Sequence, residues 1–290
     1  MKAYGGIEVN GEKVETLQEA FNIGGEVKLF ADVVITEQVN VTKEVVLNLN
    51  GHNVVAEFEH NSGAINVAHG GKLTIKGMGH VDAPKCICAI SMTTKGDTND
   101  AEVAELVIEN GIIRGYNYAV SGNGNKGRGN TKVIVNGGEL TMVATSGAGI
   151  YNPQEGDVII NGGLIEGITG IEMRSGYLEV NGGTIVGHGI PAKSTPNGNG
   201  TTSIGCGVAV AQHTTENGVE VTVNGGLLKG YSALYQSNPQ QNNSDLVNMT
   251  VNTGIFYAIN GGSIPVYSED KTGFVKGGTF VPAVEEKYMA

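Results

Sequence analysis

Three residues are the candidates for acid–base catalysis in this chain: Glu172, Arg174 and His188. Glu172 and Arg174 are two positions apart, so on a β-strand both would lie on the same face. A carboxyl, a guanidinium and an imidazole group can transfer protons or stabilise a developing charge. His188 lies between two glycines, which is a weak motif in a chain with 46 glycines. We interpret Glu172 and Arg174 as part of a row of surface ion pairs near Glu166 and Glu139 rather than as catalytic residues.

A second group of candidate residues lies in and beside four loop-like insertions that are rich in Asn, Gln, Thr and Gly. Loops on a rigid scaffold commonly carry binding residues, and tyrosine rings can stack on sugars. These polar segments suit glycans or neighbouring proteins, and solvated insertions without a ligand are the alternative. The predicted ligand-binding residues are Asn123, Asn125, Arg128, Asn197, Asn199, Gln236, Asn238, Tyr151 and Tyr235.

The elements that position these residues are repeated around the tripeptide Asn-Gly-Gly. Each copy follows and precedes a short run of alternating β-forming residues, and nine strict or degenerate copies lie between Asn50 and Lys276, on average about 28 residues apart. Glycine reaches positive φ freely and asparagine does so better than most residues, so both suit a corner. We predict a ladder of side-chain amide hydrogen bonds along the corner residues Asn136, Asn161, Asn181 and Asn224.

A weaker Gly-x-Ala-Ile motif lies between the corners, so each repeat supplies about three short strands. The predicted fold is all-β, a right-handed single-stranded parallel β-helix of nine to ten coils. Apolar spacing predicts a short capping helix at about 14–23, ended by two glycines. The expected organisation is an N-terminal cap over 1–30, the β-helix over 31–281 and a C-terminal tail or cap over 282–290.

The segment LQEAFNIGGEVKLFADVVITEQVNVTKEVVLNLNGHNVV, the Asn-Gly-Gly coils and the closing GGTF resemble the pectin-lyase-like right-handed β-helix superfamily, above all its repeat-rich members on bacterial surfaces and in phage particles. The superfamily includes lyases, hydrolases, adhesins and virion proteins, so the resemblance implies a fold more than a function. Its polygalacturonase-like members use paired aspartates, Gly-His-Gly and Arg-x-Lys. This chain has Gly187-His188-Gly189 but neither Asp-Asp nor Arg-x-Lys.

Composition excludes several classes of function. The formal net charge of −11 opposes nucleic-acid binding, which needs an excess of Lys and Arg. No apolar run is long enough for membrane insertion. The three cysteines, Cys86, Cys88 and Cys206, are predicted to be buried free thiols. Scattered histidines give no metal site, and no cofactor is expected; calcium on carboxylates is an alternative that no G-G-x-G-x-D repeat supports.

These observations favour a non-enzymatic structural and adhesive protein of a phage virion, such as a capsid decoration, a head fibre or a tail-associated protein. The chain opens without a hydrophobic export signal, which suits a protein released by lysis. Expected partners are other virion or surface proteins, further copies of the chain, and host or mucosal glycans. The alternatives are a bacterial cell-surface adhesin module, located outside the cell, and a polysaccharide lyase or glycoside hydrolase.

Overall fold

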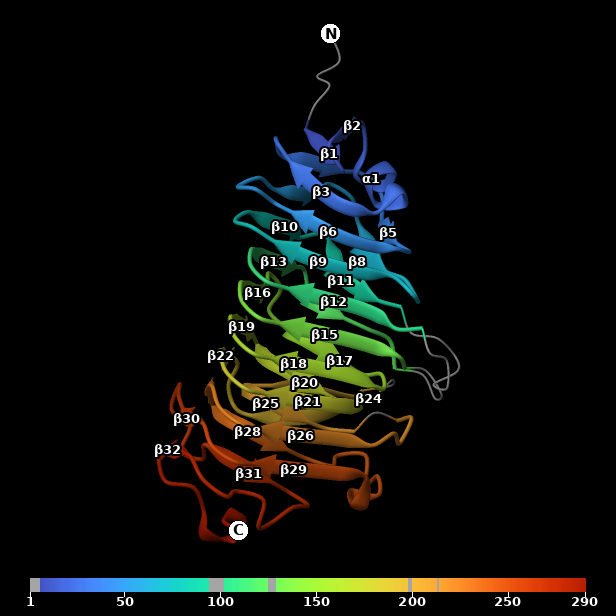
Figure 1. Ribbon diagram of the computed structural model, residues 1–290. Coiled ribbons are helices and arrows are strands. Elements are labelled where there is room, and N and C mark those ends of the chain that lie inside the picture. The colour runs from blue at the N-terminus through green and yellow to red at the C-terminus, as the bar shows by residue number, and fades with distance from the viewer. Residues whose placement is uncertain (1–5, 94–101, 125–128, 198–199, 213) are drawn as a thin grey trace.

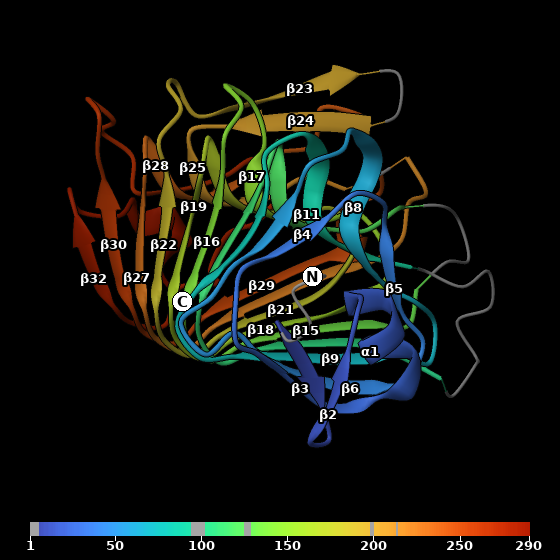
Figure 2. The same cartoon turned by 90° about the horizontal axis from the view of Figure 1, so that it is seen from above.

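The computed structural model describes residues 6–93, 102–124, 129–197, 200–212 and 214–290. These residues wind into a parallel β-helix with three long sheets, A, B and C, of 11, 10 and 9 strands. In Figure 1 the coils stack from the N-terminus at the top to the C-terminus at the bottom. Seen from the N-terminal end in Figure 2, the chain passes clockwise from sheet A to B to C while it recedes, so the helix is right-handed as predicted.

Each coil contributes one strand to each sheet. Sheet A contains β3 (Gly25–Leu29), β6 (Glu44–Asn48), β9 (Lys72–Lys76), β12 (Ala104–Ile108), β15 (Thr131–Val135), β18 (Gly156–Ile160), β21 (Gly176–Val180), β26 (Val219–Val223) and β29 (Val247–Val251). Sheet B contains β4 (Val33–Ile35), β7 (Val54–Ala56), β10 (His80–Ala83), β13 (Ile112–Gly115), β16 (Glu139–Met142), β19 (Leu164–Gly167), β22 (Thr184–Gly187), β27 (Leu227–Gly230), β30 (Ile255–Ala258) and β32 (Thr279–Val281).

Sheet C contains β5 (Val39–Val41), β8 (His60–Val67), β11 (Cys86–Met92), β14 (Tyr118–Ser121), β17 (Ala148–Asn152), β20 (Thr169–Met173), β25 (Cys206–Val210), β28 (Ser232–Gln236) and β31 (Val266–Ser268). Outside the coils, β23 (Lys193–Asn197) and β24 (Gly200–Ile204) form an antiparallel hairpin. A 3-10 turn, η1 (Ser244–Leu246), precedes β29.

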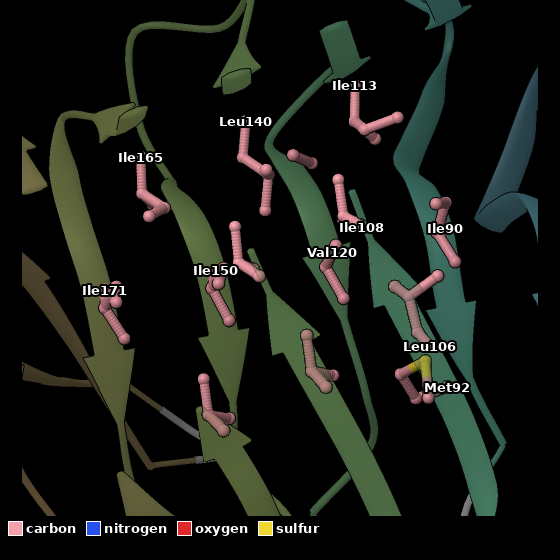
Figure 3. Packing of buried hydrophobic residues seen from close by; sticks show 14 of the residues in the cluster. Ile90, Met92, Leu106, Ile108, Ile113, Val120, Leu140, Ile150, Ile165 and Ile171 are labelled. Atoms are coloured by element: carbon pink, nitrogen blue, oxygen red, sulfur yellow. The ribbon is translucent and has the colours of Figure 1, made fainter. Parts of the chain in front are cut away.

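The core consists of aliphatic rows that run from coil to coil. Alternate residues of a strand point inward, and parallel in-register pairing places like residues one above another. In sheet C, for example, Ile90 pairs with Val120, Val120 with Ile150 and Ile150 with Ile171. Figure 3 shows these side chains directed into the interior opposite the rows of the other sheets. The short β-branched strands of the sequence therefore close one continuous core.

Four of the five Asn-Gly-Gly corners, at Asn136, Asn161, Asn181 and Asn224, lie between sheets A and B. In these four the second glycine takes the positive φ, for example +80° at Gly183, and the asparagine does not, whereas Asn260 of the fifth corner has φ +57°. At the four corners between sheets A and B, positive φ is therefore not the reason for asparagine: the amide is there for its hydrogen bonds. The ladder runs from Asn136 Nδ2 to Glu109 Oε1 (2.9 Å), Asn161 to Asn136 (2.8 Å), Asn181 to Asn161 (3.0 Å), Asn224 to Asn181 (3.0 Å) and Asn252 to Asn224 (2.7 Å).

The N-terminal cap differs in detail from the expectation. Helix α1 spans Leu17–Ile23 and begins after Thr16, whose hydroxyl accepts a hydrogen bond from the Glu19 amide. The predicted start at residue 14 is wrong because Val14 ends strand β2 (Glu12–Val14), which pairs with β1 (Ile7–Val9). Strand β1 in turn pairs antiparallel with β3, so the cap and the first coil share one sheet.

The C-terminal residues close the other end of the stack. Turn η2 (Glu286–Tyr288) brings the fully buried Tyr288 ring to 5.5 Å from the Phe274 ring. The Tyr288 hydroxyl donates to the Ser268 carbonyl (2.9 Å) and accepts from the Ser268 amide (3.0 Å). The last residues thus cover the apolar cross-section of the final coil, as a cap does.

Candidate functional site

A groove of about 510 Å³ lies on the outer face of sheet C. It crosses four successive strands, β8, β11, β14 and β17, so it runs along the stack of coils. The residues that line it are Asn61, Ser62, Asn66, Ile87, Ser91, Met92, Thr93, Tyr118, Ser121, Gly122, Asn123 and Tyr151. A concave surface with aromatic rings and a few polar groups is typical of small-ligand sites.

Strand register explains why the polar residues gather there. Asn66 pairs with Ser91, Ser91 with Ser121 and Ser121 with Tyr151, so these four residues form one outward row across four coils. Ile65, Ile90, Val120 and Ile150, each directly before a member of this row, are buried in the core. One residue position, repeated from coil to coil, therefore contributes a lining residue in each of the four strands.

Hydrogen bonds hold the N-terminal part of this row in place. The Ser91 hydroxyl donates to Asn66 Oδ1 (3.0 Å), and the Thr93 hydroxyl donates to the same oxygen (2.7 Å). Asn66 Nδ2 in turn donates to Asn40 Oδ1 (2.9 Å) on the preceding coil. Each hydroxyl oxygen keeps acceptor capacity, so the floor presents fixed, uncharged hydrogen-bonding groups to a ligand.

Two tyrosines stand at the C-terminal end of the groove. The rings of Tyr118 and Tyr151 stack with their centroids 4.9 Å apart and an interplanar angle of 18°. The Arg174 guanidinium lies 5.3 Å from the Tyr151 ring centroid. Burial raises the pKa of Tyr151 to about 12, with Arg174 acting in the opposite direction, and burial also raises the pKa of Tyr118. Both rings therefore carry neutral hydroxyl groups at physiological pH.

The Glu172–Arg174 pair lies beside this end of the groove but is closed to solvent. Arg174 Nε is 3.1 Å from Glu172 Oε1, and the two side chains are 2% and 3% exposed. Burial raises the pKa of Glu172, while Arg174 and Ser203 on β24 lower it to a smaller extent. In Figure 2 the β23–β24 hairpin lies outside the coils, over sheet C. The Thr169 hydroxyl of β20 donates to the Ser203 carbonyl of β24 (2.9 Å), which ties the hairpin to the sheet.

The expected row of surface ion pairs is therefore wrong. Glu172 belongs to sheet C, whereas Glu166 and Glu139 belong to sheet B, beyond the corner that follows β19. The structure also does not bring His188 to the buried pair. His188 directly follows β22, its Nε2 lies 3.2 Å from Glu166 Oε2, and its side chain is 53% exposed. The three acid–base candidates are thus divided between two faces of the rod.

The predicted loop residues have different positions. Asn123 and Tyr151 line the groove. Tyr235 stacks on Tyr267 farther along sheet C, with centroids 5.0 Å apart. Asn197 ends β23. Asn125, Arg128 and Asn199 lie outside the described residues.

Gln236 and Asn238 make hydrogen bonds within the protein. Gln236 is buried; it accepts from the Ser268 hydroxyl (2.6 Å) and donates to Asp270 Oδ2 (2.8 Å). The Asn238 side chain closes its own loop by donating to the Asn242 carbonyl (2.8 Å) and accepting from the Asn242 amide (2.9 Å). In both residues the amide groups satisfy neighbouring backbone and side-chain groups instead of facing solvent.

The sequence-based prediction did not include Asn61, Ser62, Asn66, Ser91, Thr93 and Ser121, because they lie in or next to strands and the predicted residues lie in and beside loops. The signal available was a polar residue at an alternate position of successive strands in the Gly-x-Ala-Ile line. Aligning INV, ISM and VSG from these segments places Asn66, Ser91 and Ser121 in one column.

Among the described residues, no group of three or more His, Cys, Asp or Glu side chains is arranged to hold a metal ion. The three cysteines are free and buried. Within the same residues, no helix has the length and apolar character needed to cross a membrane. Comparisons with family models, curated proteins and solved structures found no match to this chain. The groove is therefore interpreted from its own geometry.

Proposed function

We propose that this protein is a non-catalytic structural and adhesive rod that binds glycans in the groove of sheet C. The observation that carries the proposal is the lining: two stacked tyrosines beside a row of hydroxyl and amide groups, on one outward face. Sugars present hydroxyl groups for hydrogen bonding and C–H groups for contact with aromatic side chains, so this combination suits them.

The positions of the acid–base residues support binding over turnover. Hydrolysis of a glycosidic bond needs a carboxylic acid and a carboxylate on opposite sides of that bond. Glu172 is covered by β24 and paired with Arg174, and the described residues that line the groove include no carboxyl group. A polysaccharide lyase or hydrolase at this site would need a base that the described lining residues do not supply.

The proposed setting is the exterior of a phage particle, where the rod would be a decoration, fibre or tail-associated component; a bacterial cell surface is the alternative. Two features support an exposed role: the coils are closed at both ends by their own residues, and the β-helix spans almost the whole described chain. Mass spectrometry of purified particles, with an antibody against the rod, tests the setting separately from binding.

The test of binding is a glycan array probed with the purified protein, followed by assays for new reducing ends and unsaturated products on each hit. Binding without product formation is the expected result. Tyr151→Ala should weaken binding, while Tyr267→Ala, which removes a ring from the equivalent stacked pair outside the groove, should leave binding unchanged. Release of sugar products, or no binding to any glycan, contradicts the proposal.

A further inference from the structure

The lining of the sheet C groove is uncharged. Its described residues are asparagines, hydroxyl residues, tyrosines, a glycine and two aliphatic side chains, with no Lys, Arg, Asp or Glu. The tyrosine hydroxyls are protonated at physiological pH, since an ordinary tyrosine has a pKa of about 10 and burial raises the pKa of both residues further. The adjacent Glu172–Arg174 pair compensates its own charge. A uronate, sulfate or phosphate group in this groove would lose water without gaining a cation.

The charge of the whole chain acts in the same direction. With 29 acidic and 18 basic residues, the net charge of −11 produces a negative potential that repels polyanions. An acidic polysaccharide thus meets repulsion at long range and finds no charge partner among the described residues that line the groove. An uncharged glycan experiences neither effect.

The direction of the groove limits the shape of the ligand. Its lining residues come from four neighbouring strands of sheet C, so its long dimension follows the stack of coils. Neighbouring strands lie about 4.8 Å apart, which is close to the length of one pyranose unit in an extended chain. A linear glycan along the groove would therefore present one sugar to each coil.

The groove ends after the fourth of these coils. Glu172 on β20 is paired in register with Tyr151, and at that position the surface is buried beneath β24. A chain that extends past Tyr151 would meet the hairpin. The contacts available to a ligand are thus limited to β8, β11, β14 and β17.

From these observations we infer that the groove selects uncharged, linear glycans that lie along the rod. Each of the four coils would contact one sugar, so the groove would bind about four sugars. This inference rests on the proposed glycan-binding function and specifies its ligand class. It makes Asn66, Ser91, Ser121 and the tyrosine pair the specificity-determining residues of the site.

The test measures affinity by isothermal titration calorimetry against linear β-1,4-linked gluco- and manno-oligosaccharides of two to six units. Oligogalacturonates of matching length serve as acidic probes. For the neutral series, we expect affinity to rise by about threefold or more per added unit up to about four units and then to level off. Acidic probes should bind at least about tenfold more weakly at low salt.

Variants separate this inference from the binding function on which it rests. Asn61→Lys places a cation at the exposed rim of the groove and should strengthen binding of the acidic probes. Ser121→Ala should weaken binding of the four-unit ligand more than of the two-unit ligand, while Tyr267→Ala serves as the control. Preference for acidic glycans, or affinity independent of chain length, overturns the inference but preserves glycan binding. Absence of binding to the probes and to the array overturns both.

Discussion

The buried ion pair beside the groove provides the sharpest prediction about stability. In Arg174→Met, a side chain of similar length replaces the guanidinium, and Glu172 remains buried at 3% exposure without its charged partner. Removing one member of a buried pair costs about 3–5 kcal/mol. Loss of the guanidinium over the Tyr151 ring adds roughly 0.5–2 kcal/mol. We expect the free energy of unfolding to fall by roughly 4–7 kcal/mol, a large part of a typical domain's stability.

The pH dependence of the stability loss in Arg174→Met tests whether the buried charge of Glu172 causes it. Burial raises the pKa of Glu172 in the folded protein above its ordinary value. A carboxyl with a raised folded pKa contributes stability that is present below its unfolded pKa and is lost as pH rises through the folded pKa. Without Arg174 this pKa rises further, so the deficit of the variant should be larger at pH 8 than at pH 5.

Urea denaturation followed by tyrosine fluorescence measures both effects, since the chain has ten tyrosines and no tryptophan. The double variant Glu172→Gln/Arg174→Met should recover most of the lost stability, because no charge remains buried. Arg114→Met is the matched control. The Arg114 side chain is 43% exposed and donates two hydrogen bonds of 2.8 Å to Asp82, so its replacement should lower the free energy of unfolding by about 1 kcal/mol or less. An Arg174→Met deficit no larger than that of the control, or one equal at both pH values, refutes the reasoning.

Three further predictions concern the scaffold. Asn181→Ala breaks the amide ladder at its middle and should lower the free energy of unfolding by about 1–2 kcal/mol in urea titrations, with a smaller loss refuting a role for the ladder. Gly183→Ala places a Cβ 2.9 Å from the backbone of the preceding coil, at a position with φ +80°. Gly261→Ala has the same backbone strain at φ +88° but open space around the Cβ, so Gly183→Ala should lower the free energy of unfolding by more in the same titrations. Equal losses of stability contradict this. Burial raises the pKa of the Cys88 thiol to about 12, so iodoacetamide at pH 8 should label Cys88, by mass spectrometry, only after unfolding.

The architecture was predictable because its determinants are local and repeated. An Asn-Gly-Gly motif marks the end of one strand and the start of the next. Between these motifs, the alternation of apolar and polar residues indicates which side chains face the core. The start of the capping helix was predictable in principle as well. Thr16 and Glu19 have the spacing of a capping box, and this signal is stronger than the apolar spacing that placed Val14 in the helix.

Burial of polar side chains was the part that single-sequence reasoning could not predict. Gln236 and Glu172 occupy positions that look exposed when the strand alone is considered. They are buried because a loop from another part of the chain covers them: the segment after β31 covers Gln236, and β24 covers Glu172. Such coverage depends on the path of an irregular segment, which carries no repeat and hence no periodic signal.

The outward row of sheet C shows how this fold separates architecture from function. Inward rows must stay aliphatic because they share one core, and the corner row must keep its amides and glycines because each coil bonds to the next. The outward row has no such requirement, and its chemistry changes along the rod while its backbone register does not. It runs from amides and hydroxyls through a tyrosine to a covered carboxylate and then to a second tyrosine pair: Asn40, Asn66, Ser91, Ser121, Tyr151, Glu172, Ala209, Tyr235 and Tyr267. Specificity in this protein should therefore change through substitutions in that row, with little effect on the coils that carry it.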